Sequence, residues 1–319
     1  MDAESTPRAF HAEGRNWFRD FRIGVTGLVV KKTGARVPYS PSVIADLLAW
    51  FRFFFAAKAM APLGAPFTIA FTPERARPWY LIWPTVHAAG GRLVKDAAQA
   101  DVVMHFDDAT FSPNPPPAGI KADARLINFG CRDVSKSKVA EAFEAAFGYP
   151  LAIDPATYVG PAVEKSEING AHDGRIVQCP TLALRGRTYQ RVVDARGQNP
   201  ELVEDLRTPT LGGKPACVFI KRRPVTKRFA NANSEVEMAR VEAIFSADEM
   251  AKIEDFARRL GLDWGGLDVL RDKGDGRLYI VDANKTDMGP PIALPLSDKL
   301  VATRLLATAF REFVSRPAG

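Results

Sequence analysis

The stretch Gly261–Pro291, GLDWGGLDVLRDKGDGRLYIVDANKTDMGPP, decides the fold. Its turn-forming run Asp272–Gly276 separates two apolar runs, so the stretch predicts two antiparallel strands joined by a tight turn. A hairpin centred on this run places Asp268 directly opposite Asp282. Because residues two apart on a strand share a face, Asn284 lies beside them.

The other positions of this hairpin are apolar on both faces, which predicts that the hairpin lies in the interior. We expect Leu270 and Ile280 on the face of the two aspartates, and the opposite face carries Val269, Val281 and Tyr279. Two opposed carboxylates in an interior hairpin repel each other and lose hydration, and a divalent cation would remove that conflict. Oxygen ligands of the Asp and Asn type suit Mg²⁺. The alternative is that both aspartates lie at strand ends as solvated caps.

Length and composition indicate a globular protein with more than one subdomain. A chain of 319 residues exceeds the usual size of a single core. The net charge of +6 fits an anionic ligand, a nucleic acid or an acidic surface without choosing among them. Three widely spaced cysteines exclude a disulfide framework and suit a reducing compartment, so we expect a cytoplasmic protein. The most apolar stretch, Leu47–Leu63, is too short to span a bilayer, and the polar N-terminus lacks a signal-peptide core.

Residues 1–20 are expected to be a poorly anchored arm, and residues 21–133 alternate short strands with helical segments. This alternation predicts a parallel sheet in a Rossmann-like N-terminal domain. The first strand-to-helix turn has no GxGxxG, so dinucleotide binding is not supported.

Basic residues and a glycine-containing loop predict an anion site. Lys165 ends a strand that leads into the polar loop Ser166–Gly174, where the backbone at Asn169 and Gly170 can present N–H groups to an anion. Lys165 could instead be an edge lysine that reaches water.

A second basic feature ends the expected strand Ala216–Ile220, where Lys221, Arg222 and Arg223 follow one another. These side chains could neutralise a transferred phosphate, or form a solvated or nucleic-acid-binding face. Arg207 could hold a substrate carboxylate in a bidentate pair, or make a structural ion pair with Asp205 or Glu204.

The order of these features from about residue 133 to residue 291 resembles the ATP-grasp superfamily. The resemblance implies two α+β lobes, at residues 134–195 and 196–319, with ATP between their antiparallel sheets and Mg²⁺ beside its phosphates. Carried over by position, the resemblance implies a phosphate-binding lysine (Lys165) beside the loop at Asn169 and Gly170, an adenine hinge (Gln190, Arg191, Val193, Asp194) and metal ligands (Asp268, Asp282, Asn284). From the basic residues themselves we expect a further ATP contact from Lys221 and catalytic roles for Arg207 and Arg222. The family also has a lysine on the preceding helix, which is Lys136 or Lys138 here, with Lys136 favoured.

Two departures from the family pattern concern the metal strand and the phosphate loop. The usual Glu of the metal strand is Asp282, which is one methylene shorter, and the stretch from Lys165 to the hinge is short. The motif Asp205-Leu206-Arg207 and the run Lys221–Arg223 resemble a branch of the superfamily associated with cell-surface polysaccharide synthesis.

The resemblance implies an ATP- and Mg²⁺-dependent, ADP-producing ligase that joins a carboxylate to an amine through an acylphosphate. The alternatives are a small-molecule kinase on the same scaffold, and a non-catalytic protein that binds a nucleotide or polyanion. Opposed carboxylates beside Asn284 argue against the non-catalytic alternative. The expected partners are ATP and a small carboxylate or hydroxyl compound, with no membrane span and no nucleic acid. The sequence indicates neither the substrates nor the oligomeric state.

Overall fold

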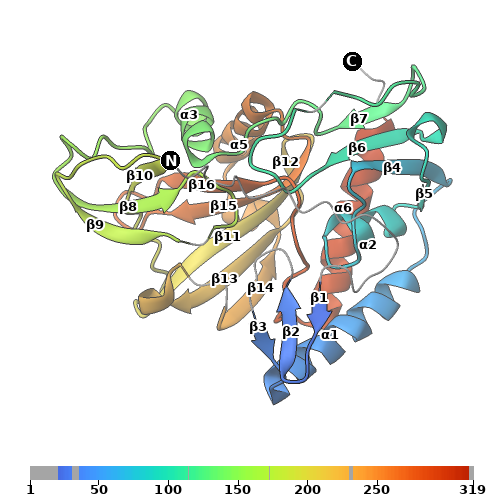
Figure 1. Cartoon of the computed structure of the whole chain (residues 1–319), viewed down its shortest axis with the longest axis horizontal. Helices are drawn as coiled ribbons and strands as arrows, with labels where there is room; N and C mark the ends of the chain where they lie inside the picture. The colour runs from blue at the N-terminus through green and yellow to red at the C-terminus, as the bar shows by residue number, and fades with distance from the viewer. Residues whose placement is uncertain (1–20, 31–35, 114, 172, 230–232, 316–319) are drawn as a thin grey trace, which may run out of the picture.

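The computed structural model describes residues 21–30, 36–113, 115–171, 173–229 and 233–315. The expected arm at residues 1–20 lies outside the described residues. Within them the strands form four sheets. Figure 1 shows a parallel sheet on the right, two antiparallel sheets on the left, and a small antiparallel sheet at the bottom. No helix in the described ranges is long and apolar enough to cross a membrane.

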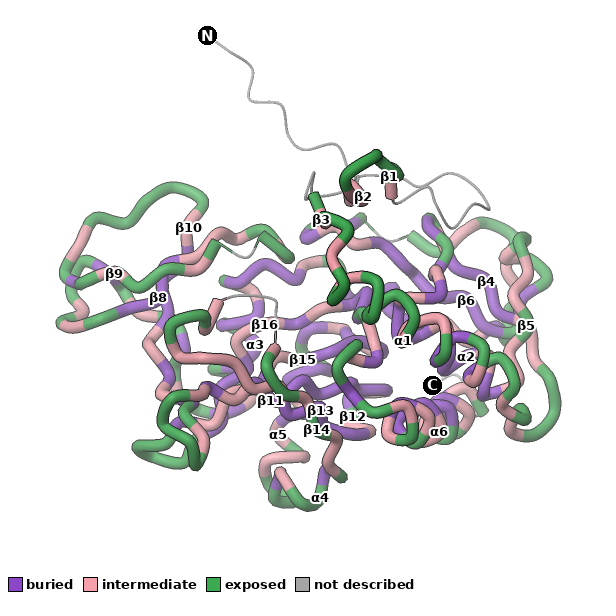
Figure 2. The backbone as a smooth tube through the Cα atoms, turned by 90° about the horizontal axis from the view of Figure 1, so that it is seen from below, coloured by how far each residue is buried: buried purple, intermediate pink, exposed green. Residues whose placement is uncertain are grey.

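The first described elements are a small antiparallel sheet and a long helix. They are β1 (Phe21–Ile23), β2 (Gly27–Val30), β3 (Arg36–Pro38) and α1 (Pro41–Lys58). Ser40 caps α1, because its side chain accepts a hydrogen bond from the Val43 backbone N–H, and Pro41 occupies the first turn. Figure 2 shows exposed residues along much of this helix.

The next sheet is parallel, as the alternation of strands and helical segments predicted. Its elements are β4 (Phe67–Pro73), α2 (Ile82–Ala88), β5 (Gly91–Leu93), the 3₁₀ turn η2 (Ala97–Gln99), β6 (Val102–Phe106) and β7 (Arg125–Ile127), with strand order β5-β4-β6-β7. The last helix of the chain, α6 (Leu296–Ser315), packs against α1 and α2, and its Phe310 stacks on Phe67. The N-terminal sheet therefore shares its core with the C-terminal end of the chain.

The first antiparallel lobe has three strands in the order β10-β8-β9. Its elements are α3 (Lys136–Phe147), β8 (Gly160–Ser166), β9 (Arg175–Cys179) and β10 (Arg187–Arg191). Ser135 caps α3 by accepting from the Lys138 N–H, and this fixes Lys136 as the first residue of the helix.

The second antiparallel lobe has the strand order β14-β13-β11-β15-β16, with β12 paired to β11. Its elements are β11 (Leu202–Leu211), β12 (Lys214–Pro215), β13 (Val218–Pro224), the 3₁₀ turn η3 (Val225–Lys227), β14 (Glu235–Ala239), α4 (Val241–Ile244), α5 (Ala247–Leu260), β15 (Trp264–Arg271) and β16 (Leu278–Asn284). Ser246 and Glu249 form the capping box of α5 that the sequence predicts, and Gly261 ends the helix.

Helix α3 packs on α5 and on β16, so it belongs to the same hydrophobic core as the second lobe's hairpin. In that core Phe143 of α3 lies 5.7 Å, between ring centroids, from Tyr279 of β16. This packing holds the N-terminus of α3 beside β16, the strand predicted to carry metal ligands. Lys136 therefore lies close to Asp282.

The β15–β16 hairpin has the predicted register, with Asp268 paired to Asp282 and Gly266 paired to Asn284. The register shifts just after Asp268, because β16 carries one extra residue there. The prediction that Ile280 shares the aspartate face is therefore wrong. Ile280 is buried in the core, and Val281 faces the cleft instead.

The αL residue that ends α5 makes a close contact with the turn that follows β7 of the N-terminal sheet. Gly261 has a φ of 69°, and a Cβ there would lie 2.5 Å from the backbone of Gly130. Gly148 ends α3 with a φ of 79°, and a Cβ there would meet nothing within 4 Å.

We expect Gly261→Ala to lower the melting temperature much more than Gly148→Ala. Both substitutions carry the left-handed strain of about 1–2 kcal/mol, and only Gly261→Ala adds a backbone clash. Thermal unfolding of the two variants measures the difference. Equal melting temperatures would show that the α5 terminus does not pack against the N-terminal sheet as described.

Candidate functional site

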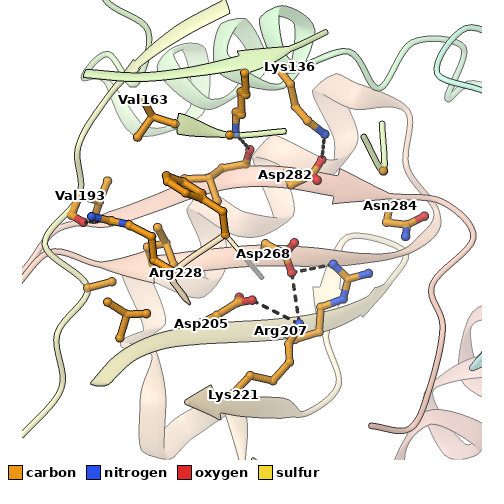
Figure 3. A pocket seen from close by; sticks show the side chains of 18 of the residues that line it. Lys136, Val163, Val193, Asp205, Arg207, Lys221, Arg228, Asp268, Asp282 and Asn284 are labelled. Atoms are coloured by element: carbon orange, nitrogen blue, oxygen red, sulfur yellow. Dashed lines mark hydrogen bonds and ion pairs between the residues drawn. The ribbon is translucent and has the colours of Figure 1, made fainter. Parts of the chain in front are cut away.

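A cleft of about 580 Å³ lies between the two antiparallel lobes. Its walls come from β8, β10 and the loop after β8 on one side, and from β11, β13, β15 and β16 on the other (Figure 3). The cleft brings together most of the residues predicted from the sequence, which are Lys136, Lys165, Asn169, Gly170, Gln190, Arg191, Val193, Arg207, Lys221, Asp268, Asp282 and Asn284.

The cleft is apolar at one end and charged at the other. The register along β11 sets the order, because Val203 pairs with Arg223, Asp205 with Lys221, and Arg207 with Asp268. Val203 and Arg207 are four residues apart, which is about 13 Å along a strand. The end near Val203 is lined by apolar residues, namely Val163, Val193, Ala195, Leu270 and Val281. A flat apolar ring fits that end, and a polyanion fits the end with the lysines and arginines.

Two lysines of the first lobe reach across the cleft to β16. The Nζ of Lys136 lies 2.5 Å from Asp282 Oδ1 and 3.2 Å from Asn169 Oδ1. The Nζ of Lys165 donates to the Val281 carbonyl at 2.9 Å. Burial lowers the pKa of Lys165 to about 8, with the nearby Lys136 ammonium adding to the effect.

The lowered pKa of Lys165 has a consequence for stability. Between about pH 8 and the ordinary lysine pKa of 10.5 the unfolded chain binds more protons at this position than the folded chain. This group therefore opposes folding most below pH 8, and the opposition fades as the pH rises through this window. A lysine held this way suits an anionic ligand, because a phosphate would restore its preference for the charged form.

Each of the two opposed aspartates pairs with a cation of the protein. The expectation that their mutual repulsion is unrelieved without a bound metal is therefore wrong. Asp282 pairs with Lys136, while Asp268 accepts from Arg207 Nη1 at 2.7 Å and lies 3.7 Å from the Lys221 Nζ. Burial alone would raise the pKa of Asp268, but Arg207 and Lys221 lower it well below its usual range.

Arg207 makes neither of the ion pairs expected from its neighbours in the sequence. Its Nη2 donates to Asp287 Oδ1 at 2.6 Å, and its Nη1 donates to Asp268. These carboxylates raise the pKa of Arg207 well above its usual value against the opposing effect of burial. Arg207 is therefore a fixed, fully charged group at the charged end of the cleft.

Two predicted site residues do not face the cleft. Arg222 lies between Lys221 and Arg223 on β13, and side chains alternate along a strand, so Arg222 is not among the lining residues. Its guanidinium pairs with Glu204 at 2.7 Å and with Glu237 at 3.1 Å. The carboxylate of Asp194 turns away to Arg196. Its neighbour Val193 does line the cleft.

The Asp268, Asp282 and Asn284 side chains carry the oxygen donors that Mg²⁺ prefers. Among the described residues, Oδ2 of Asp268 and Oδ2 of Asp282 accept no hydrogen bond. The described residues contain no group of three or more Asp, Glu, His or Cys side chains that could hold a metal alone. The donor set therefore fits a cation that takes further ligands from water or phosphate.

The structure adds lining residues to those that the sequence analysis assigned to the ATP, metal and catalytic sites. Asp205 and Arg223, which the sequence analysis named only within an Asp-x-Arg motif and a basic run, pair at 2.6 Å across β11 and β13. Arg223 lines the cleft because it shares a face of β13 with Lys221. Asp287 and Arg228 carry no signal of this kind, since each reaches the cleft from a loop.

No protein-family model and no curated protein matches the chain. Among solved structures, the chain is similar to the ATP-grasp ligase PsnB complexed with minimal precursor, with a TM-score of 0.48, 13% identity, and coverage of 79% of this chain and 100% of that chain. It is similar to a RimK domain ATP-grasp protein from Sphaerobacter thermophilus, with a TM-score of 0.46, 16% identity, and coverage of 77% and 99%. It is also similar to the D-cycloserine synthetase DcsG, with a TM-score of 0.45, 14% identity, and coverage of 78% and 99%.

The first two of these structures are described as ATP-grasp proteins. All three TM-scores lie below 0.5, so the function proposed below is supported by the residues of the cleft and not by these likenesses.

We expect Lys136 and Asp282 to be energetically coupled across the cleft. Removing either partner leaves the other charge partly buried, so Lys136→Met and Asp282→Asn should each destabilise the ligand-free protein, and the double variant should lose less than the sum. A charged hydrogen bond predicts a coupling energy of about 1.5–3 kcal/mol. Denaturant unfolding of the four proteins measures it. Strictly additive losses would contradict the contact.

Proposed function

We propose that the chain is an ATP-grasp enzyme that uses ATP and Mg²⁺ to join a carboxylate to an amine. The observation that carries the proposal is the pair of first-lobe lysines, Lys136 and Lys165, that meets the Asp- and Asn-bearing strand β16 across a two-lobed cleft. Two lysines that face Asp and Asn oxygens suit a nucleoside triphosphate, with a divalent cation between its phosphates and those oxygens.

The cleft would hold ATP along its length. The purine would enter the apolar end beside Val163, Val193 and Val203, and the phosphates would lie at the charged end, beside the two lysines. The loop at Asn169 and Gly170 borders the phosphate end. This loop is anchored to the N-terminal domain, because the Asn169 N–H donates to Thr110 Oγ1 at 2.9 Å.

Asp268, Asp282 and Asn284 would hold Mg²⁺, which neutralises phosphate charge when bound. The alternative roles of Asp268 and Asp282 as solvated caps are less compatible with the structure, because both residues lie within strands and pair with buried cations.

The reaction would proceed in two transfers. A carboxylate oxygen of the substrate attacks the γ-phosphorus of ATP, ADP leaves, and an acylphosphate forms. The amine then attacks the acyl carbon, releases phosphate and loses a proton. Arg207, Lys221 and Arg223 would place fixed positive charge around the transferred phosphoryl group. Their carboxylate partners hold these cations in place before substrate binds.

Product analysis tests this proposal. The protein is incubated with Mg-ATP and a panel of amino acids, small peptides and sugar acids, and both ADP and inorganic phosphate are measured. A ligase releases ADP and phosphate in equal amounts only when both a carboxylate and an amine are present. ADP formed without phosphate would mean a kinase, and no binding of Mg-ATP at millimolar concentration would overturn the assignment.

We expect Lys221→Met to lower kcat by about a hundredfold, as loss of one preorganised donor does in other enzymes. Arg222→Met is the matched control, because Arg222 is the next residue on β13 and does not line the cleft. Its kcat should stay near that of the unchanged protein. Equal losses of kcat in both variants, with unchanged melting temperatures, would contradict the assignment of the two faces of β13.

A further inference from the structure

A segment of the second lobe crosses the apolar end of the cleft. After β13, the turn η3 leads to Arg228, whose Nη2 donates to the Val193 carbonyl at 2.9 Å (Figure 3). The segment is anchored at its start, where the Val225 N–H donates to the Glu201 carbonyl at 2.9 Å. It is also anchored at its end, where Phe229 lies so close to Gly174 that a Cβ there would be 2.9 Å from the ring.

Arg228 differs in its contacts from Arg207 and Arg223, which also line the cleft. Arg207 and Arg223 pair with carboxylates. The contacts of Arg228 in the described residues are with the neutral Val193 carbonyl and with the ring of Phe229, 5.5 Å from its centroid. Burial lowers the pKa of Arg228. This guanidinium is therefore held in the cleft on a backbone acceptor, with no ion pair to any residue that the structure describes.

The Val193 carbonyl is the acceptor that an adenine would need. It lies at the apolar end of the cleft, where a purine ring fits, and the 6-amino group of adenine is a hydrogen-bond donor. The neighbouring Gln190 is buried, and its Nε2 has no hydrogen-bond partner among the described residues. With Arg228 in place, this end presents N–H donors at the position where a 6-aminopurine also brings a donor.

We propose that Arg228 sets the base specificity of the nucleotide by competing with the 6-amino group of ATP for the Val193 carbonyl. ATP must displace the guanidinium before its amino group can donate to this oxygen. A 6-oxopurine nucleotide such as ITP carries an acceptor at that position, so it can bind while Arg228 stays in place. This inference rests on the proposed function only in that the cleft takes a purine nucleoside triphosphate.

The test compares the dissociation constants of Mg-ATP and Mg-ITP for three proteins without any acceptor substrate. The unchanged protein is measured beside Arg228→Met, which removes the donor, and Arg196→Met. Arg196 is the matched control, because it lies near the hinge and pairs with Asp194 outside the cleft. Titration calorimetry gives the constants, and Arg228→Gln is a second variant in case Arg228→Met does not fold.

Removing Arg228 should tighten ATP binding about tenfold, because a hydrogen bond from a charged group no longer has to be broken. ITP binding should stay the same or weaken, so the preference for ATP over ITP rises at least tenfold, while Arg196→Met should behave like the unchanged protein. Weaker ATP binding in the Arg228 variants, or an unchanged ratio of the two constants, would overturn the inference and leave the proposed function standing. Binding of neither nucleotide to the unchanged protein would overturn the proposed function itself.

Discussion

The contact on which the rest of the site depends is the one between Lys136 and Asp282. A partly buried ammonium needs an anion, and Asp282 supplies it from the other side of the cleft. The contact is possible because Ser135 starts α3 at that point and because α3 packs on α5 and β16. The helix cap, the core and the cleft are thus parts of one arrangement, in which the lysines of one lobe are held against the acidic strand of the other.

The N-terminal parallel sheet contributes to the same arrangement. The side chain of Asn128, just after β7, donates to the Trp264 carbonyl and accepts from the Asp263 and Trp264 N–H groups. This joins the parallel sheet to the start of β15, one of the strands that line the cleft. Thr286, which follows β16, donates to Asp108 at the end of β6. The carboxyl edge of the parallel sheet therefore borders the charged end of the cleft, which is the usual place for ligands in such sheets.

Local sequence signals predicted the parts of the site that depend on short-range geometry. The turn at Asp272–Gly276 predicted that Asp268 and Asp282 face each other in the hairpin. The extra residue at Val281 could not be predicted, because a bulge shifts the register without a distinctive residue type. The partner of Arg207 is Asp287, eighty positions away in the sequence, so only the packed structure reveals it. Arg222 was assigned to the cleft because a run of three basic residues outweighed the alternation of the strand.

The central claim is that Lys136 and Lys165 are positioned to bind the phosphates of a nucleotide, and proton uptake tests it most directly. At about pH 8.5 Lys165 is mostly neutral, because its pKa is lowered to about 8. A phosphate group beside it should raise that pKa, so nucleotide binding should take up protons. Titration calorimetry with Mg-ATP in two buffers of different ionisation enthalpy measures this uptake. The account predicts uptake by the unchanged protein and none by Lys165→Arg, whose guanidinium stays charged. Nucleotide binding without proton uptake at this pH, or equal uptake by both proteins, would contradict it.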